Sequence, residues 1–284
     1  VNNCTATEGN SNSPVLFFTV VSNMVIDNVD ASRPSGKDRS GIYINNSSIN
    51  SNVTVRNCNF NNYYRGMYIT GGRDYTITNN SFLNSGYIAD QPAIYLSYIQ
   101  SNSLPGGILM SGNTFGGTNA LSGVRFEHMR DLIIGDTSVV GRNITFEDNC
   151  GLNNHAYNSS SNGYNLIHLV NVNNATIDNV DVSRPVGATP AQDLTGIRID
   201  NSSDYGAVTI KNYDARRHRS GIILSGGQNY TVNNNDLRGC GFNSEEPAFY
   251  INSISQLDAS IPMGLTASGN KFGSANSINM NCGI

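Results

Sequence analysis

Five ionisable side chains near the middle of the chain are the best candidates for chemistry. Two carboxylic acids each follow an arginine by two residues, and a histidine lies between these two pairs in the sequence. Inverting glycoside hydrolysis uses two carboxyl groups roughly 6.5–9.5 Å apart, one as the acid and one as the base that activates water. A histidine can act as a general base, and arginines bind acidic sugars through paired hydrogen bonds. The candidate catalytic residues are Glu127, Asp200, His168, Arg125 and Arg198.

The same cluster has two other interpretations. A lyase would use an arginine or the histidine to remove the proton beside a neutralised carboxylate. Alternatively, the charges form a solvated surface with ordinary ion pairs, which contribute little to stability. If Glu127 and Asp200 lie two strands apart, they are separated by about 9.6 Å, which keeps the hydrolase hypothesis open.

Tyrosines that alternate with apolar residues are candidates for sugar contact. Each stands at the centre of a short alternating segment, where its side chain is expected to face outward. The central residues of successive segments are expected to stack in one outward row, which also holds Arg125, His168 and Arg198. Aromatic faces pack on sugar rings, and phenol groups add hydrogen bonds. Stacked tyrosines can instead stabilise neighbouring strands, so both interpretations stay open. The candidate substrate-binding tyrosines are Tyr43, Tyr68, Tyr95 and Tyr250.

A basic segment, Arg216-Arg217-His218-Arg219, precedes the alternating residues that begin at Gly221. We interpret it as a loop. Its arginines Arg217 and Arg219 are further candidates for holding an acidic glycan, because guanidinium groups bind carboxylates in a bidentate manner. A solvated basic loop without a ligand is the alternative.

The elements that position these residues repeat along the chain. Residues 26–34 return as residues 177–185, with eight of nine identical. A finer period of roughly 25 residues lies inside each half, which is typical of a solenoid. We therefore expect one rod over residues 1–284, with pseudo-repeats 1–149 and 150–284.

Each short repeat predicts two strands. The first reads glycine, apolar, outward, apolar and small polar, as in Gly41-Ile42-Tyr43-Ile44-Asn45. Such alternation indicates a strand buried on one face. The second strand runs into an asparagine-rich turn, and asparagine tolerates the left-handed backbone of a tight corner. The pattern predicts an all-β fold, a right-handed parallel β-helix of about ten coils. Inward residues would include Ile42, Ile69, Leu96, Ile199 and Leu224.

Composition fits a secreted surface protein. Only 13% of the residues are charged, the net charge is −4, and 43 asparagines supply polarity. No basic cluster favours nucleic acid, and no apolar run is long enough to cross a membrane. The chain starts at Val1 without a signal segment, so we expect a mature or excised extracellular protein. We expect no nucleic-acid partner and no membrane insertion.

Three of the five cysteines, Cys4, Cys150 and Cys282, each follow an asparagine at the seams of the long repeat. Cys4 and Cys150 would lie roughly 24 Å apart along the rod, too far for a disulfide. Buried inert thiols are one interpretation, and an intermolecular bridge in end-to-end self-association is the other. No Cys-x-x-Cys or His-x-x-x-His spacing predicts a metal site, and no cofactor is expected.

The segments 75–82 and 230–237, each preceded by a glycine-apolar-x-apolar segment, resemble the repeats of pectate-lyase-like right-handed parallel β-helices. That superfamily includes polysaccharide lyases, glycoside hydrolases, phage tailspikes and adhesins. The resemblance implies an extracellular β-helix that binds or cleaves a polysaccharide or cell-surface glycan. A non-enzymatic structural or adhesive rod, such as a filament subunit or a segment of a longer repeat array, is the alternative, because fold alone does not choose an activity.

Overall fold

The structure is a computed structural model, in which the chain forms β-strands. The structure describes residues 1–5, 13–33, 40–46, 51–86, 91–97, 107–116, 123–135, 145–146, 164–183, 191–241, 247–254 and 264–273. Among these residues there is no helix, and so no helix long and apolar enough to cross a membrane. Cys150 and Cys282, two of the seam cysteines, lie outside the described residues.

Short strands dominate the first half of the chain, and longer ones follow. The strands are β1 (Leu16–Thr19), β2 (Met24–Asp27), β3 (Ser40–Asn46), β4 (Val53–Arg56), β5 (Arg65–Gly71), β6 (Tyr75–Thr78), β7 (Ser81–Leu83), β8 (Ile94–Ser97), β9 (Ile108–Ser111), β10 (Thr114–Gly116), β11 (Val124–Arg130), β12 (Leu132–Ile134), β13 (Thr145–Phe146), β14 (Tyr164–Asp178), β15 (Ala191–Lys211), β16 (His218–Asn233), β17 (Phe249–Asn252) and β18 (Leu265–Ser268). The β-branched and aromatic residues that fill them favour extended backbone.

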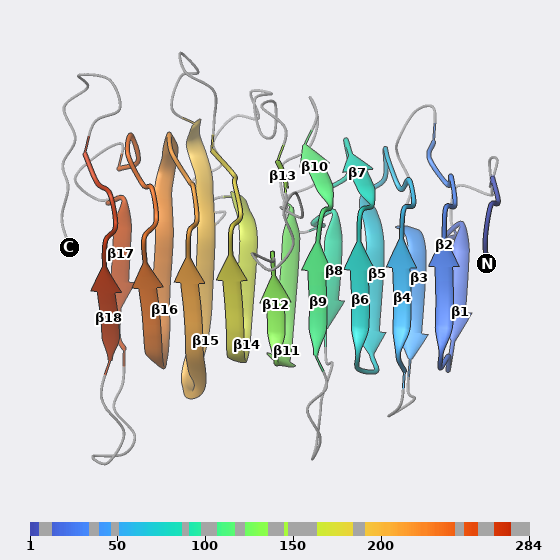
Figure 1. The fold of residues 1–284 in the computed structure, drawn as a ribbon, viewed down its shortest axis with the longest axis horizontal. Helices are drawn as coiled ribbons and strands as arrows, with labels where there is room; N and C mark the ends of the chain where they lie inside the picture. Colours follow the sequence, from blue (N-terminus) through green and yellow to red (C-terminus); the bar gives the residue numbers. More distant parts are fainter. Residues whose placement is uncertain are drawn as a thin grey trace.

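Fifteen of these strands form one large parallel sheet, and β7, β10 and β13 form a small one. Figure 1 shows two rows of strands, one behind the other, with β1 and β18 at opposite ends of the long axis. The strand β14 joins the two rows, because its first part pairs with β11 and its last part with β12. This all-β, parallel architecture confirms the predicted strands and is consistent with a β-helix-like fold.

The apolar residues of the predicted alternating pattern form the hydrophobic core. Ile42, Ile69, Leu96, Ile199 and Leu224 all face inward and are fully buried, as expected. In β1 and β17, the strands at the two ends of this row of strands, the inward side chains of Leu16, Phe18 and Ile251 are only partly buried. The difference follows from position, since a side chain in an end strand lacks a described neighbour on one side.

Asparagine makes the corners that follow the second strands. Asn79 and Asn234 adopt left-handed backbone with φ of 57°, which confirms the role predicted for such residues. The next residue, Asn80, is buried; its Oδ1 accepts a hydrogen bond from the Cys58 backbone at 3.0 Å, and its Nδ2 donates to Val55 at 3.0 Å. These side-chain amides satisfy backbone groups that the corner leaves unpaired.

Candidate functional site

The outward residues of the first row of strands align across the molecule. Tyr95 on β8 pairs in register with Arg125 on β11, which pairs with His168 on β14. His168 in turn pairs with Arg198 on β15. The spacing of parallel strands is about 4.8 Å, so Arg125 and Arg198 stand about 9.6 Å apart with His168 between them. The register confirms the row that the sequence pattern predicted.

Glu127 is held by two donors. Arg125 Nε donates to its Oε1 at 2.6 Å, and the Tyr95 hydroxyl on the preceding strand donates to its Oε2 at 2.7 Å. The Glu127 side chain is 14% exposed, so these contacts lie partly out of water. Burial and the Glu127 contact raise the pKa of Tyr95 to about 12, which keeps that hydroxyl a donor.

Asp200 repeats this arrangement. Arg198 Nε and His168 Nε2 each lie 2.8 Å from its Oδ2, and His168 comes from the preceding strand. Burial alone would raise the pKa of Asp200, but the two hydrogen bonds outweigh it and lower the pKa to about 2. The carboxylate of Asp200 therefore stays ionised at every ordinary pH.

Both ion pairs are made through the Nε atoms of the arginines. The Arg125 and Arg198 side chains are 33% and 25% exposed. A guanidinium has five N–H donors in a planar fork, so a contact through Nε leaves its two terminal nitrogens for another acceptor. Carboxylates are the acceptors that match this fork best. The row can therefore offer two preoriented guanidinium groups to an anionic ligand.

The geometry limits acid–base catalysis by the two carboxyl groups. Glu127 and Asp200 stand two strand steps apart, because Val170 pairs with both in the shared register. That separation, about 9.6 Å, is close to the range of inverting hydrolases. However, such an enzyme needs one carboxylic acid protonated, and the low pKa of Asp200 leaves it only the role of base.

Three of the candidate tyrosines stack on one another. The ring centroids of Tyr43 and Tyr68 lie 4.7 Å apart, and those of Tyr68 and Tyr95 lie 5.2 Å apart. Their planes differ by 8° and 21°, so the rings cover each other's faces. The arrangement favours strand stabilisation over sugar stacking, because a sugar needs a free aromatic face. Tyr250, 41% exposed on β17, lies further along the same row.

The sequence pattern did not single out Arg65, at the start of β5. Its guanidinium carbon lies 4.9 Å from the ring centroid of Tyr68 and 5.2 Å from that of Tyr95. This cation–π contact places a third arginine beside the aromatic part of the row. The only signal for it in the sequence is its position just before Gly66, which begins an alternating segment.

The basic segment around residues 216–219 is not an open loop. His218 and Arg219 begin β16, and Arg217 is only 8% exposed, which leaves little of it for a ligand. His218 is fully buried, and its Nε2 lies 2.6 Å from the Val182 carbonyl oxygen. The hydrophilic composition of the segment was misleading because its side chains fill a corner of the fold.

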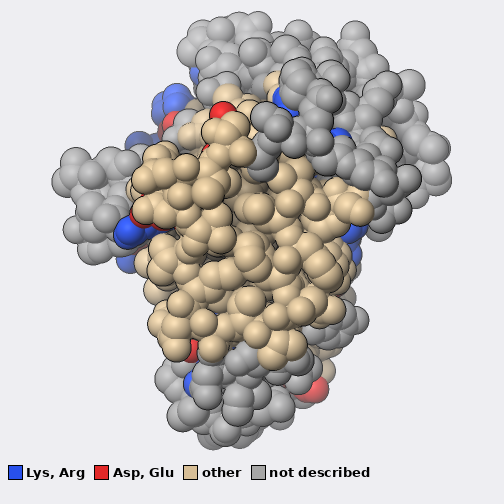
Figure 2. Space-filling view, turned by 90° about the vertical axis from the view of Figure 1, so that its right-hand side faces the viewer, with Lys and Arg blue, Asp and Glu red and all other residues tan. Residues whose placement is uncertain are grey.

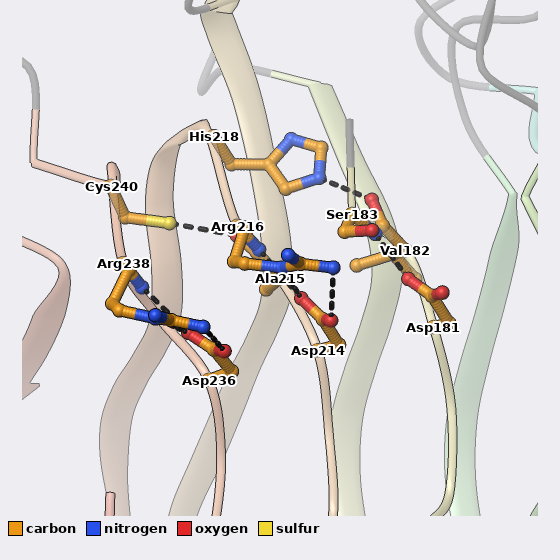
Figure 3. A network of polar contacts seen from close by, with 10 residues as sticks. All are labelled: Asp181, Val182, Ser183, Asp214, Ala215, Arg216, His218, Asp236, Arg238 and Cys240. Atoms are coloured by element: carbon orange, nitrogen blue, oxygen red, sulfur yellow. Dashed lines mark hydrogen bonds and ion pairs between the residues drawn. The ribbon is translucent and has the colours of Figure 1, made fainter. Parts of the chain in front are cut away.

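Figure 3 shows the ion pairs beside this corner. Arg216 Nη2 lies 2.8 Å from Asp214, and Arg238 Nη2 lies 2.5 Å from Asp236. The buried Cys240 donates to the Ala215 carbonyl at 2.8 Å, and burial raises the pKa of its thiol to about 12. Each arginine here binds its own carboxylate through Nε and the terminal nitrogen Nη2 together, whereas Arg125 and Arg198 bind theirs through Nε.

No family model matches the chain, and no curated protein resembles it closely enough to count as a relative. Within the described residues, no group of three or more His, Cys, Asp or Glu side chains is placed to hold a metal ion.

Proposed function

We propose that this protein is an extracellular, right-handed parallel β-helix that binds an acidic polysaccharide along the face carrying Arg125, His168 and Arg198. The observation that carries the proposal is the parallel register, which sets these three side chains on adjacent strands in one outward row. A polymer that follows the rod would meet them in succession.

Several features of the chain support the finer description of the fold. Every strand pairing among the described residues is parallel, and the long strand β14 passes from one row to the other, as successive coils of a β-helix would require. Parallel crossovers are nearly always right-handed. The finer repeat of roughly 25 residues implies about ten coils. The low charge and asparagine-rich composition favour an extracellular location.

Binding is better supported than cleavage. Each carboxylate already accepts hydrogen bonds from an arginine and a second donor, and Asp200 remains ionised. Each arginine keeps its terminal nitrogens for another acceptor. Charge-assisted hydrogen bonds to a ligand carboxylate are roughly twice as strong as neutral ones, so a uronate-bearing polymer fits this row better than a neutral one.

A non-enzymatic structural rod is the second candidate. The stacked tyrosines favour it, because Tyr43, Tyr68 and Tyr95 use their ring faces on one another. In that case the whole outward row serves strand cohesion, and the face binds no glycan.

Affinity electrophoresis with a polyuronate and with a neutral glucan of similar length separates these candidates. The proposal predicts that the polyuronate retards the protein and the glucan does not, with binding that weakens as salt rises. Product analysis on the same mixtures reports new reducing ends for hydrolysis and unsaturated ends for a lyase. Equal retardation by both polymers, or by neither, would contradict acidic-polysaccharide binding.

A further inference from the structure

One end of the rod exposes positions that are buried elsewhere. Leu16 and Phe18 of β1 pair in register with Ile42 and Ile44, which are fully buried, yet they are only partly buried themselves. Figure 2 views this end, where the described surface is largely uncharged at its centre and charged side chains lie toward its margin. The exposed apolar residues here are Val1 (50%), Phe17 (56%), Val20 (67%) and Val25 (48%).

The opposite end shows the same feature. Leu265 of β18 pairs with the buried Tyr230 but is only partly buried. Phe272 follows Lys271, the bridge partner of Asp236, and so aligns with the fully buried Leu237, yet it is 37% exposed. Both ends therefore resemble a core that has been cut across, with apolar side chains left without a described neighbour.

The two ends carry complementary halves of one backbone ladder. At the first end, Asp30 N donates to Cys4 O, so the Thr5 N–H and C=O point away from Asp30, as in any parallel bridge. At the other end, Lys271 donates to Asn235 O and accepts from Leu237 N, so its neighbours Asn270 and Phe272 direct their backbone groups outward. An unpaired edge of this kind is a template for another strand.

We propose that copies of this chain associate head to tail, with residues 1–5 of one molecule adding as a parallel strand to the β18 end of the next. In the pairing that continues the existing ladder, Thr5 N–H donates to Asn270 C=O, and Phe272 N–H donates to Thr5 C=O. Lys271 then lies beside Thr5, and Asp30 lies on the other side of Thr5, two strand steps or about 9.6 Å from Lys271.

Charge complementarity supports a second copy as the occupant. Lys271 and Asp30 are both exposed and belong to opposite ends, and each stands in the corresponding series of bridges of its half of the chain. The apolar side chains at each end would cover one another, as they do between neighbouring strands inside the molecule. Because the contact joins two different surfaces, it does not close into a dimer but continues into filaments. This proposal goes beyond polysaccharide binding and does not depend on it.

A proline at Thr5 tests the ladder directly. Thr5→Pro removes the N–H that would donate to Asn270 of the next copy, whereas Thr5→Ala keeps it. Sedimentation under reducing conditions, chosen because Cys4 is an exposed thiol, should show concentration-dependent oligomers for the wild type and for Thr5→Ala. We expect Thr5→Pro to weaken association about tenfold or more. A wild type that stays monomeric at all concentrations, or a Thr5→Pro variant that associates as well as Thr5→Ala, would overturn the proposal.

The head-to-tail geometry has a test of its own. Thr5→Pro retains an intact β18 end, so a small fraction of it added to wild type should stop growth and shorten the oligomers. Lys271→Glu should weaken association about twofold, most clearly at low salt, and adding Asp30→Lys should restore it. Circular dichroism checks that each variant is folded. A contact between identical ends would not be shortened by a small fraction of the proline variant, and that result would contradict the geometry.

Discussion

The aromatic and charged parts of the outward row use the same strand positions in different ways. Tyr43, Tyr68 and Tyr95 stack on one another across neighbouring strands, ring face against ring face. Arg125 and Arg198 instead bond a carboxylate two residues further along their own strand and keep terminal nitrogens for another acceptor. Register alone therefore does not make a binding site. A side chain can bind a ligand only where its contacts with neighbouring side chains leave a ring face or a hydrogen-bond donor uncovered.

Removing the central ring of the aromatic part should have the largest effect. Tyr68→Ala loses two stacked partners and the contact with Arg65, so we expect the free energy of unfolding to fall by about 2–3 kcal/mol. Urea denaturation measures the loss. Tyr250→Ala is the control, because Tyr250 is 41% exposed in the same row, and it should cost less than about 1 kcal/mol. Equal losses at the two positions would show that ring stacking at Tyr68 adds no stability beyond that of an exposed tyrosine.

Acid should lower the free energy of unfolding by protonating Asp200. Its pKa is about 2 in the folded protein and lies below the value of 3.8 expected for the unfolded chain. The stability that follows is fully present above about pH 4 and is lost as pH falls toward 2. We expect it to amount to about 1–2 kcal/mol after solvent screening.

Asp200→Asn should remove this share of the pH dependence, measured by urea denaturation between pH 5 and pH 2. Asp204→Asn, which removes an exposed carboxyl from the same strand, is the control. A wild type and an Asp200→Asn variant whose stabilities run parallel over this range would show that the hydrogen bonds from His168 and Arg198 contribute nothing.

Arg65 should matter least, and only for stability. Arg65→Met removes a cation–π contact worth about 0.5–1 kcal/mol and leaves the arginines of the charged part untouched. Urea denaturation should detect the small loss, while affinity for a polyuronate stays within twofold. A large drop in affinity would place Arg65 inside the binding surface and move its boundary into the aromatic part.

The sequence predicted the strands and the row because the repeat fixes both. A glycine followed by alternating apolar residues marks each first strand, so aligning the segments also aligned Arg125 with His168 and Arg198. The inward residues followed from the same alternation, apart from those at the two ends. Asparagine corners followed from the left-handed backbone that this residue tolerates.

Side-chain direction was not predictable in the same way. The pattern placed Tyr43 and Tyr68 outward, but only rotamers decide whether their rings cover each other. The internal repeat could have predicted that His218 is buried, although the basic composition of its segment suggested an exposed loop. His218 occupies the place of the buried Tyr63 in the first half, and their side chains bond the equivalent carbonyls of Val182 and Ala31.

In the proposed function, Arg125 and Arg198 hold a carboxylate-bearing polymer. The most direct measurement compares polyuronate affinity for the wild type, the double variant Arg125→Gln/Arg198→Gln and the control double variant Arg216→Gln/Arg238→Gln. Both variants lose two positive charges, but each control arginine already commits Nη2 as well as Nε to Asp214 or Asp236. We expect at least a tenfold loss of affinity for the first variant and less than twofold for the second. An equal loss in both would show that the polymer senses only overall charge, and it would contradict the site.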